Sequence, residues 1–285
     1  MRNTYYTLIT GASEGFGKAL AIECASRKMN LILVALPGNE LHSLTDFIKR
    51  NYCVDVISIE KDLCRDESCS ELFNEVTAMN LQMNMLINNA GIGSTMMFEK
   101  GSVTLYENQI KLNVLATTLI TRLFLENLKQ SSTSYILNVG SMASFFSLPR
   151  KQVYGATKSF IYSFSKSIRK ELEKDKVHVS VLCPGGMNTN LALTLMNKTG
   201  NCLSRLSVMN PEDVAPVAID GLLKRKEVII PGRMNKLFMF LNWLLPTWIK
   251  KIITNNGMNK LDPHNSLTRY LYPDPVTTLT TQPII

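Results

Sequence analysis

The sequence is poor in the residue patterns that hold metal ions or disulfides. Its histidines are far apart and share no ligand spacing; they are His42, His178 and His264. None of the cysteines forms a Cys-x-x-Cys pair; they are Cys24, Cys53, Cys64, Cys69, Cys183 and Cys202. Zinc sites and disulfide frameworks depend on such spacings. We therefore expect no metal site, and we expect free thiols in a reducing compartment.

The sequence also lacks a long uninterrupted apolar run. A helix that crosses a bilayer needs about 20 consecutive apolar residues. The chain instead starts a short strand-like run at residues 5–10, and a glycine follows it directly. We therefore expect neither a signal peptide nor a membrane-spanning helix, and we expect the cytoplasm as the location.

Acidic residues are fewer than basic residues, and most of the basic excess lies in one segment. The net charge is +8, with 31 basic and 23 acidic residues. Between Lys224 and Lys260 there are eight basic residues and one acidic residue, so this segment holds most of the excess. The rest of the chain is near neutral, and we expect no nucleic-acid binding. With 285 residues and 45% hydrophobic content, the chain fits an α/β domain that buries a large core.

Strand and helix patterns alternate along most of the chain. Apolar, β-prone runs predict strands at residues 5–10, 31–35, 54–59, 85–87, 135–139, 178–183 and 228–230. Helical patterns lie between them, among them residues 40–51, 66–79 and 106–128. This order predicts a Rossmann-like, doubly wound parallel sheet of about seven strands with helices on both faces. Right-handed crossovers would bring the carboxyl ends of the strands to one edge, where ligands bind.

A glycine-rich turn, Thr10-Gly-Ala-Ser-Glu-Gly-Phe-Gly17, joins the first predicted strand to the first predicted helix. Such a turn leaves backbone N–H groups free at the helix N-terminus and lets a pyrophosphate come close. The alternative is a plain turn that needs glycine for its backbone alone. Three glycines at this spacing, in the first strand-to-helix connection, make phosphate binding the favoured interpretation.

The end of the second predicted strand does not settle which nucleotide is bound. A carboxylate there would favour NAD, and an arginine would favour NADP. The sequence has Ala35-Leu36-Pro37 instead. Glu14 in the glycine-rich turn weakly disfavours the additional phosphate of NADP, but the choice between NAD and NADP stays open.

Tyr154 and Lys158 stand four residues apart at the start of a predicted helix, so they share one face. A cation close to a phenol favours its ionised form, and such a pair can pass a proton at neutral pH. Ser141 ends the fifth predicted strand and is either a turn residue or a hydrogen-bond donor to a substrate oxygen. Asn113 lies inside a predicted helix, where it faces solvent or serves another purpose.

These segments together resemble the short-chain dehydrogenase/reductase family in its common single-domain form. The shared motifs are the turn at residues 10–17, Asp62, Asn88-Asn-Ala-Gly91, Asn113, Ser141, Tyr154-x-x-x-Lys158, and Pro184-Gly185 with Thr189. They occur in the family's order and spacing across about residues 5–230. The resemblance implies an oxidoreductase that uses NADP or NAD to interconvert a carbonyl and a secondary alcohol.

The resemblance also implies roles for single residues. Tyr154 would exchange a proton with the substrate, Lys158 would hold the nicotinamide ribose and favour the tyrosinate, and Ser141 would polarise the carbonyl. Asn113 would hold a water in the proton relay. The implied cofactor contacts are Gly11, Ser13, Glu14, Gly15, Phe16, Gly17, Asp62, Leu63, Asn89, Ala90, Gly91, Tyr154, Lys158, Pro184, Gly185 and Thr189. Among them, the glycines would line the pyrophosphate, Asp62 the adenine, Asn89 the adenosine, and Thr189 the carboxamide.

The last third of the chain bears on the substrate and on partners. We expect residues 1–232 to form the NAD(P)-binding catalytic domain, with a substrate loop at residues 185–210, and residues 233–285 to form a C-terminal extension. The apolar side chains of the loop indicate a fairly apolar substrate, steroid-like or acyl-chain, unless they pack on the core. Residues 235–253, apolar with flanking lysines, suit peripheral contact with a membrane surface. The alternative is packing on the same domain or on another subunit. The resemblance implies a homo-oligomer, either dimer or tetramer.

Two rival functions follow from the same residues. One is a nucleotide-binding redox sensor or regulator without catalysis, and the other is a membrane-associated scaffold with vestigial activity. A sensor has no need of a proton relay, so the presence of Asn113, Ser141, Tyr154 and Lys158 argues against it.

Overall fold

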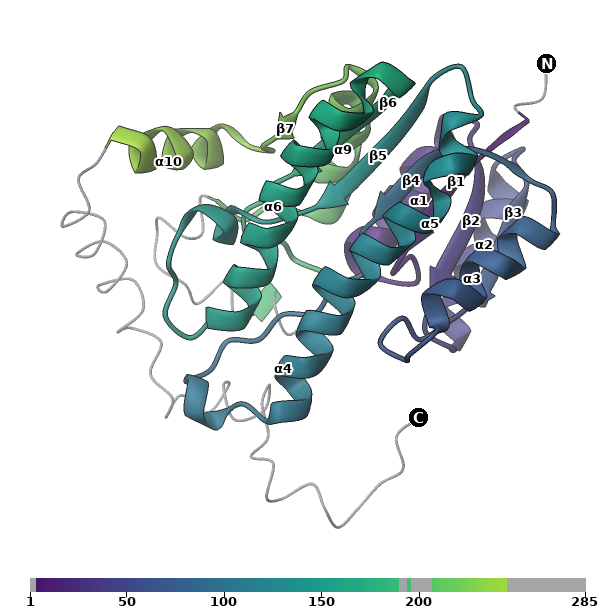
Figure 1. The fold of residues 1–285 in the computed structure, drawn as a ribbon. Helices are drawn as coiled ribbons and strands as arrows, with labels where there is room; N and C mark the ends of the chain where they lie inside the picture. Colours follow the sequence, from purple (N-terminus) through teal and green to yellow (C-terminus); the bar gives the residue numbers. More distant parts are fainter. Residues whose placement is uncertain (1–3, 190–193, 196–206, 245–285) are drawn as a thin grey trace, which may run out of the picture.

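The computed structural model describes residues 4–189, 194–195 and 207–244, and a parallel sheet lies at its centre (Figure 1). The sheet has seven strands in the order β3-β2-β1-β4-β5-β6-β7. The strands are β1 (Tyr5–Thr10), β2 (Asn30–Ala35), β3 (Val56–Glu60), β4 (Gln82–Asn88), β5 (Ser134–Val139), β6 (Val177–Leu182) and β7 (Val228–Ile229). Every neighbouring pair is parallel. The predicted doubly wound parallel sheet is therefore confirmed.

Helices cover both faces of the sheet, as predicted. They are α1 (Gly15–Ser26), α2 (Asn39–Asn51), α3 (Ser68–Ala78), α4 (Val103–Ile110), α5 (Thr117–Lys129), α6 (Gln152–Leu172), α9 (Pro211–Leu223) and α10 (Arg233–Leu244). Short 3₁₀ turns lie at Phe98–Lys100, Met142–Phe145 and Glu173–Asp175. Helices α1, α2 and α9 pack in one core cluster, and α3, α5 and the end of α6 pack in a second.

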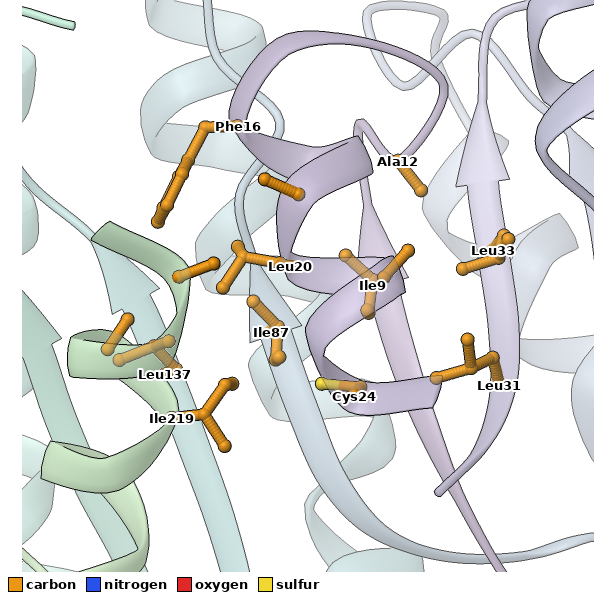
Figure 2. Packing of buried hydrophobic residues seen from close by; sticks show 14 of the residues in the cluster. Ile9, Ala12, Phe16, Leu20, Cys24, Leu31, Leu33, Ile87, Leu137 and Ile219 are labelled. Carbon is orange, nitrogen blue, oxygen red and sulfur yellow. The ribbon is translucent and has the colours of Figure 1, made fainter. Parts of the chain in front are cut away.

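The two core clusters explain why the strands read as continuous apolar runs. Successive side chains of a strand point to opposite faces, so a strand covered on both sides needs apolar residues throughout. Ile9 of β1 packs under α1, whereas its neighbour Leu8 packs in the cluster on the other face. Figure 2 shows Ile9, Leu31 and Ile87 of three adjacent strands beneath Leu20 of α1.

The helix predicted at residues 106–128 is interrupted. Its middle is a π-helical turn, Lys111–Ala116, which joins α4 to α5. A π turn is closed by hydrogen bonds between residues five apart, where an α-helix joins residues four apart, and it commonly occurs at functional sites. Apolar periodicity alone does not distinguish such a turn from an α-helical one.

The C-terminal part of the described chain packs against the rest. Helix α10 lies beyond β7 at one end of the sheet (Figure 1). Phe238 and Met239 of α10 pack in a third core cluster, which we call the α10 cluster, with Met142, Ile161 and Ile230. No helix within the described ranges is long and apolar enough to cross a membrane. The division at residue 232 stays a prediction, and residues 245–285 of the expected extension lie outside the described residues.

The expected substrate loop is described at its two ends. Residues 190–193 and 196–206 lie outside the described residues. Met187 and Met209 form an isolated parallel bridge, and Asn188 donates its backbone N–H to the Met209 carbonyl at 3.2 Å. The Asn188 side chain also donates to Asn210 Oδ1 at 2.9 Å. The two ends of the loop are thus held side by side.

Candidate active site

The candidate site lies at the carboxyl edge of the sheet, where the connections from β1 and β4 diverge. Neighbouring strands whose connections leave to opposite sides create a crevice for ligands in sheets of this kind. Thr10 ends β1, and its Oγ1 accepts hydrogen bonds from the backbone N–H groups of Asn89 and Ala90 at 3.0 and 3.1 Å. Asn89 in turn donates its side-chain amide to the carbonyls of Thr10 and Gly11 at 3.0 and 2.9 Å. These bonds fix the glycine-rich turn against the end of β4.

The glycines of this turn meet specific steric demands. Gly11 and Gly15 have φ values of +63° and +52°, a region that side chains rarely tolerate. A Cβ on Gly17 would lie 1.8 Å from the Gly11 carbonyl oxygen, so only glycine fits there. Thr189 lies against Gly15, because a Cβ added at Gly15 would come within 3.1 Å of the Thr189 Cβ. The predicted phosphate cradle and Thr189 are therefore brought together.

Other residues predicted to contact the cofactor differ in how far their side chains are buried. Ser13 is half-buried and Glu14 is exposed at the start of α1. Phe16 is buried in the core cluster under α1, so its side chain is occupied with packing. Asp62 follows β3 and accepts the backbone N–H of Cys64 at 2.9 Å, and Leu63 is buried beside it.

Pro184 and Gly185 follow β6 at the same edge of the sheet. The Pro184 carbonyl accepts the backbone N–H of Met142 at 2.8 Å, which ties the end of β6 to the turn after β5. A Cβ on Gly185 would lie 2.6 Å from Asn235 Oδ1 and 2.7 Å from the Ser207 carbonyl oxygen. Gly185 is thus packed against the end of the substrate loop and against α10.

Asn113 sits in the π turn and points inward. It is 1% exposed, so the solvent-facing alternative is wrong. Its Nδ2 donates to the Ile92 carbonyl at 2.9 Å and to Thr157 Oγ1 at 3.0 Å, and its Oδ1 accepts the Ile92 N–H at 2.9 Å. Thr157, which sequence reasoning missed, donates its hydroxyl to the Tyr154 carbonyl at 2.8 Å. Asn113 therefore connects the loop after β4 to the first turns of α6.

Lys158 is buried at the centre of the site. It is 5% exposed, and its Nζ donates to the Val139 carbonyl at 2.7 Å. The ammonium lies 5.9 Å from the centre of the Tyr154 ring. Burial lowers the pKa of Lys158 to about 8. A Cβ on Gly91 would come within 3.3 Å of the Lys158 Nζ, so Gly91 forms one wall beside this amine.

The Tyr154 and Ser141 side chains are hydrogen-bonded at the carboxyl edge of the sheet. Burial raises the pKa of Tyr154, while a hydrogen bond with the Ser141 side chain works in the opposite direction. Ser141 Oγ also accepts the Ala143 N–H at 3.1 Å, which fixes its orientation. Gly93 packs against the ring, since a Cβ there would lie 3.3 Å from Tyr154 Cδ2. Sequence reasoning missed Gly93, although it follows Gly91 by two residues.

The expected lowering of the Tyr154 pKa is wrong for this arrangement. Removal of a phenolate from water costs free energy, and here that effect is the largest one acting on Tyr154. The Lys158 ammonium does not offset it, because it is directed at the Val139 carbonyl. Tyr154 is therefore a protonated phenol at neutral pH.

A buried polar network supports the strand ends behind the site. Asn88 and Asn138 are register partners on β4 and β5. Asn88 donates to Asn138 Oδ1 at 2.8 Å and to Thr121 Oγ1 at 2.9 Å, and Asn138 donates to Ser165 Oγ at 2.9 Å. Sequence reasoning took Asn88 only as part of the strand-end motif. Each of the two predicted strands has an asparagine near its end, and this shared feature could have indicated the bond between Asn88 and Asn138.

A carboxylate that sequence reasoning missed stands near the end of β2. Glu60, the last residue of β3, pairs in register with Ala35. Its Oε1 accepts the Gly38 N–H at 3.0 Å and lies 3.1 Å from His42 Nε2. The sequence of β2 does not reveal this carboxylate, because the neighbouring strand β3 supplies it.

Comparison with known proteins identifies a family for this chain. The family model described as short chain dehydrogenase matches residues 6–199. The 3-oxoacyl-[acyl-carrier-protein] reductase FabG of Aquifex aeolicus is 28% identical over 219 residues, covering 75% of this chain and 88% of that protein. The NADP-dependent 3-hydroxy acid dehydrogenase of Schizosaccharomyces pombe is 30% identical over 233 residues, covering 78% and 88%.

Solved structures show the same fold. A short-chain dehydrogenase from Sphingobium yanoikuyae in complex with NADPH has a TM-score of 0.74 and 25% identity, covering 92% of this chain and 98% of that one. A 7beta-hydroxysteroid dehydrogenase has a TM-score of 0.78 and 23% identity, covering 90% and 97%. The chain therefore belongs to the short chain dehydrogenase family. It is an oxidoreductase of the kind that acts on carbonyl and alcohol groups with NAD or NADP.

Proposed function

We propose that this oxidoreductase interconverts a fairly apolar ketone and its secondary alcohol, with Tyr154 as the group that exchanges the proton. One observation supports this most strongly. Tyr154 hydrogen-bonds Ser141 at the strand edge, and Lys158 is buried beside the Tyr154 ring on the same helix. A sensor or a scaffold would have no use for an acidic hydroxyl, a hydrogen-bond donor and a buried amine in this order.

The residues present fit a dinucleotide. The turn at residues 11–17 offers a glycine-lined backbone at the N-terminus of α1, and a side chain at Gly17 would fill the space that brings the turn and helix together. When bound there, the cofactor supplies or accepts the hydride. Lys158 is the candidate to hold the nicotinamide ribose, and Thr189, which lies against Gly15, is the candidate to meet the carboxamide.

The protein's own part in the reaction is to orient the carbonyl and move a proton. Ser141 donates a hydrogen bond to the carbonyl oxygen and thereby polarises it. Tyr154 is a phenol that is protonated at neutral pH, and burial raises its pKa further; it then donates its proton to that oxygen. Lys158, whose Nζ donates to the Val139 carbonyl, would hold the nicotinamide ribose and is not assigned a part in lowering the Tyr154 pKa. Asn113 holds the loop after β4 in place and is the candidate to retain a water in the relay back to solvent.

The support for an apolar substrate comes from the surroundings of Ser141. Met142, Phe145 and Phe146 follow it and pack in or against the α10 cluster. Met187 and Met209 pair at the base of the substrate loop. Relatives of this chain include proteins named 11-beta-hydroxysteroid dehydrogenase and very-long-chain 3-oxoacyl-CoA reductase. Steroid-like and acyl-chain ketones are therefore the substrates to test first.

The test is cofactor-dependent turnover of a panel of such ketones. We expect NADH or NADPH to be oxidised in the presence of at least one of them, and we expect the Tyr154→Phe variant to lose that activity. Equal turnover by the variant would contradict the proposed role of Tyr154. Cofactor binding without turnover of any panel member would favour the sensor.

The preference for NAD over NADP is part of the proposal. Glu60 places a carboxylate next to the end of β2, and Glu14 is exposed at the start of α1. Negative charge repels the additional phosphate of NADP. Lys61, the nearest cation in sequence, lies 3.3 Å from Glu71 and 3.5 Å from Glu75 and is thus partly neutralised. These charges favour NAD.

We also propose a homo-oligomer formed through α4, the π turn, α5 and α6. Large apolar side chains are exposed on these helices; they are Val103, Ile110, Leu115, Leu119 and Phe160. Ile110, Val114, Ala156 and Phe160 line an open groove between α4 and α6. Burial of apolar surface of this kind drives association.

A single charge on this face is expected to weaken the oligomer. Phe160, 41% exposed and stacked on Phe164 at 5.7 Å, would lie inside the interface. In Phe160→Glu the mass measured by light scattering should fall to that of a monomer, because a carboxylate cannot be buried unpaired. Phe47→Glu on α2, 46% exposed, is the matched control and should not change the mass. An unchanged mass for Phe160→Glu would contradict the proposal.

Helix α10 supports peripheral membrane contact as a further part of the proposal. Its inner side is packed, with Asn235 1% exposed and Phe238 against the α10 cluster. Its outer side exposes Leu237, Phe240, Leu241 and Leu244 at helical spacing. Arg233 and Lys236 are exposed at its first turns. An apolar face with basic neighbours suits the surface of an anionic bilayer.

Loss of this apolar face is expected to reduce binding to vesicles. Phe240 is 53% exposed and Leu237 is 44% exposed, so replacing both by serine should remove the contact without loss of core packing. We expect the double variant to pellet less with phosphatidylserine-containing vesicles than the unmodified full chain does. Phe47→Ser, which removes an exposed apolar side chain from α2, is the control for non-specific binding to vesicles. Equal pelleting of the double variant and the unmodified chain would contradict the membrane proposal.

A further inference from the structure

A second lysine lies beside Tyr154. Lys151 directly precedes α6 and is half-buried. Its Nζ lies 5.4 Å from the centre of the Tyr154 ring, closer than the 5.9 Å of Lys158. The proposed mechanism assigns a role to Lys158 but none to Lys151.

The same helix carries a lysine with the same contact and an ordinary explanation. Lys166 Nζ lies 5.4 Å from the centre of the Tyr162 ring and 3.8 Å from Glu227 Oε1, so a carboxylate balances its charge. Lys151 has no carboxylate within ion-pair distance in the part of the chain that the structure describes. Lys166 thus has both an aromatic ring and an acidic partner, whereas among the described residues Lys151 has the ring without an acidic partner.

The environment of Lys151 makes an anion favourable there. Burial lowers the pKa of Lys151, and no charge within the described ranges opposes this effect. An ammonium that is partly removed from water without a counter-ion costs free energy, and a carboxylate beside it restores that loss. Since the lysine is next to the residue proposed to donate the proton, an anion at Lys151 would be part of the molecule that is bound at Tyr154.

We propose that Lys151 selects carbonyl substrates that carry a carboxylate, which it binds while Tyr154 protonates the carbonyl oxygen. The inference rests on the proposed function and narrows it from apolar ketones in general to oxo acids and hydroxy acids with an apolar remainder. Lys151 is thus a specificity-determining residue. A charge-assisted hydrogen bond of this kind changes affinity by roughly ten- to a hundredfold.

The test compares an acid with its uncharged ester. A medium-chain 3-hydroxy acid and its methyl ester are oxidised with NAD or NADP by the full-length protein, by Lys151→Met and by Lys151→Arg. We expect kcat/KM for the acid to fall ten- to a hundredfold in Lys151→Met, while kcat/KM for the ester changes less than threefold. Lys151→Arg should keep the preference for the acid. Lys166→Met, the matched control, should behave as the unmodified protein.

A binding measurement keeps the inference testable if neither compound is turned over. Octanoate is titrated calorimetrically into the protein with NAD or NADP present, and we expect Lys151→Met to bind it at least tenfold more weakly than the unmodified protein. Failure of turnover with this binding pattern intact would count against the proposed function and for the role of Lys151.

Two results would overturn the inference. One is equal octanoate binding by Lys151→Met and the unmodified protein. The other is an equal loss of turnover for acid and ester in Lys151→Met with a displaced pH profile. That second pattern would mean that Lys151 acts on the ionisation of Tyr154 and not on the charge of the substrate.

Discussion

Replacing Tyr154 with phenylalanine is expected to lower kcat about a thousandfold, which is a typical contribution of a positioned acid or base. The variant keeps the ring, which packs against Gly93 and lies near two lysines, and loses only the hydroxyl that hydrogen-bonds Ser141. Cofactor affinity should therefore change less than threefold. Initial rates of NAD(P)H oxidation with an active ketone, together with calorimetric titration of the cofactor, measure both quantities.

Tyr162→Phe is the matched control for this variant. Tyr162 lies two turns further along α6, where its ring packs edge-on against Phe145 with the ring centres 4.9 Å apart. Removal of its hydroxyl should leave kcat within a factor of two. If Tyr154→Phe retained full kcat, or if both variants lost activity to the same extent, the proposed proton transfer by Tyr154 would be wrong.

Replacing Gly17 with valine is expected to abolish measurable cofactor binding. The added Cβ alone would lie 1.8 Å from the Gly11 carbonyl oxygen and 2.6 Å from the Asn89 amide nitrogen, so the turn must move away from α1. Such a movement separates the backbone N–H groups that would receive the pyrophosphate. We expect the dissociation constant to rise more than a hundredfold, as measured by calorimetry.

The stability of the Gly17 variant has to be measured with its affinity. Overpacking of this kind typically costs about 1–3 kcal/mol of folding free energy, so thermal unfolding should show a lower Tm but a cooperative transition. Gly155→Ala is the control, because a Cβ there meets only the Ala143 carbonyl oxygen at an ordinary 3.7 Å. Unchanged cofactor affinity in a folded Gly17→Val protein would contradict the phosphate cradle.

The fold could be predicted from the sequence because both faces of the sheet are covered. Most strands then appear as apolar runs, and all seven predicted strands are present. The bounds of some strands differ from the predicted ones. Strand β4 starts at Gln82 and not at residue 85, because its first residues alternate polar and apolar and do not form an apolar run. The π turn at residues 111–116 was not predicted, since apolar periodicity alone does not distinguish it from an α-helical turn.

The candidate site could be predicted only where a motif names the residue. Tyr154 contacts Ser141 and Lys158 at the sheet edge, and Gly11 is bonded to Asn89 at the end of β4. Their roles stay predictions until the variants are measured.

Other features of the site depend on contacts between residues that are far apart in the sequence. Asn113 bonds Thr157 across 44 residues, and Glu60 reaches the end of β2 through strand pairing. The direction of the Tyr154 pKa shift was missed for a similar reason. It depends on how far the ring is buried and on where the Lys158 ammonium points, neither of which a spacing of four residues reveals.

The most direct test of the central claim is a calorimetric titration of the full-length protein with NADH and with NADPH. It needs no knowledge of the substrate and examines the turn at residues 11–17 on which the rest of the site depends. We predict saturable binding with one molecule per chain, tighter for NADH because Glu60 and Glu14 place negative charge near the expected 2′-phosphate. Binding of neither nucleotide would contradict the assignment of this edge of the sheet as a cofactor site, and with it the proposed reaction.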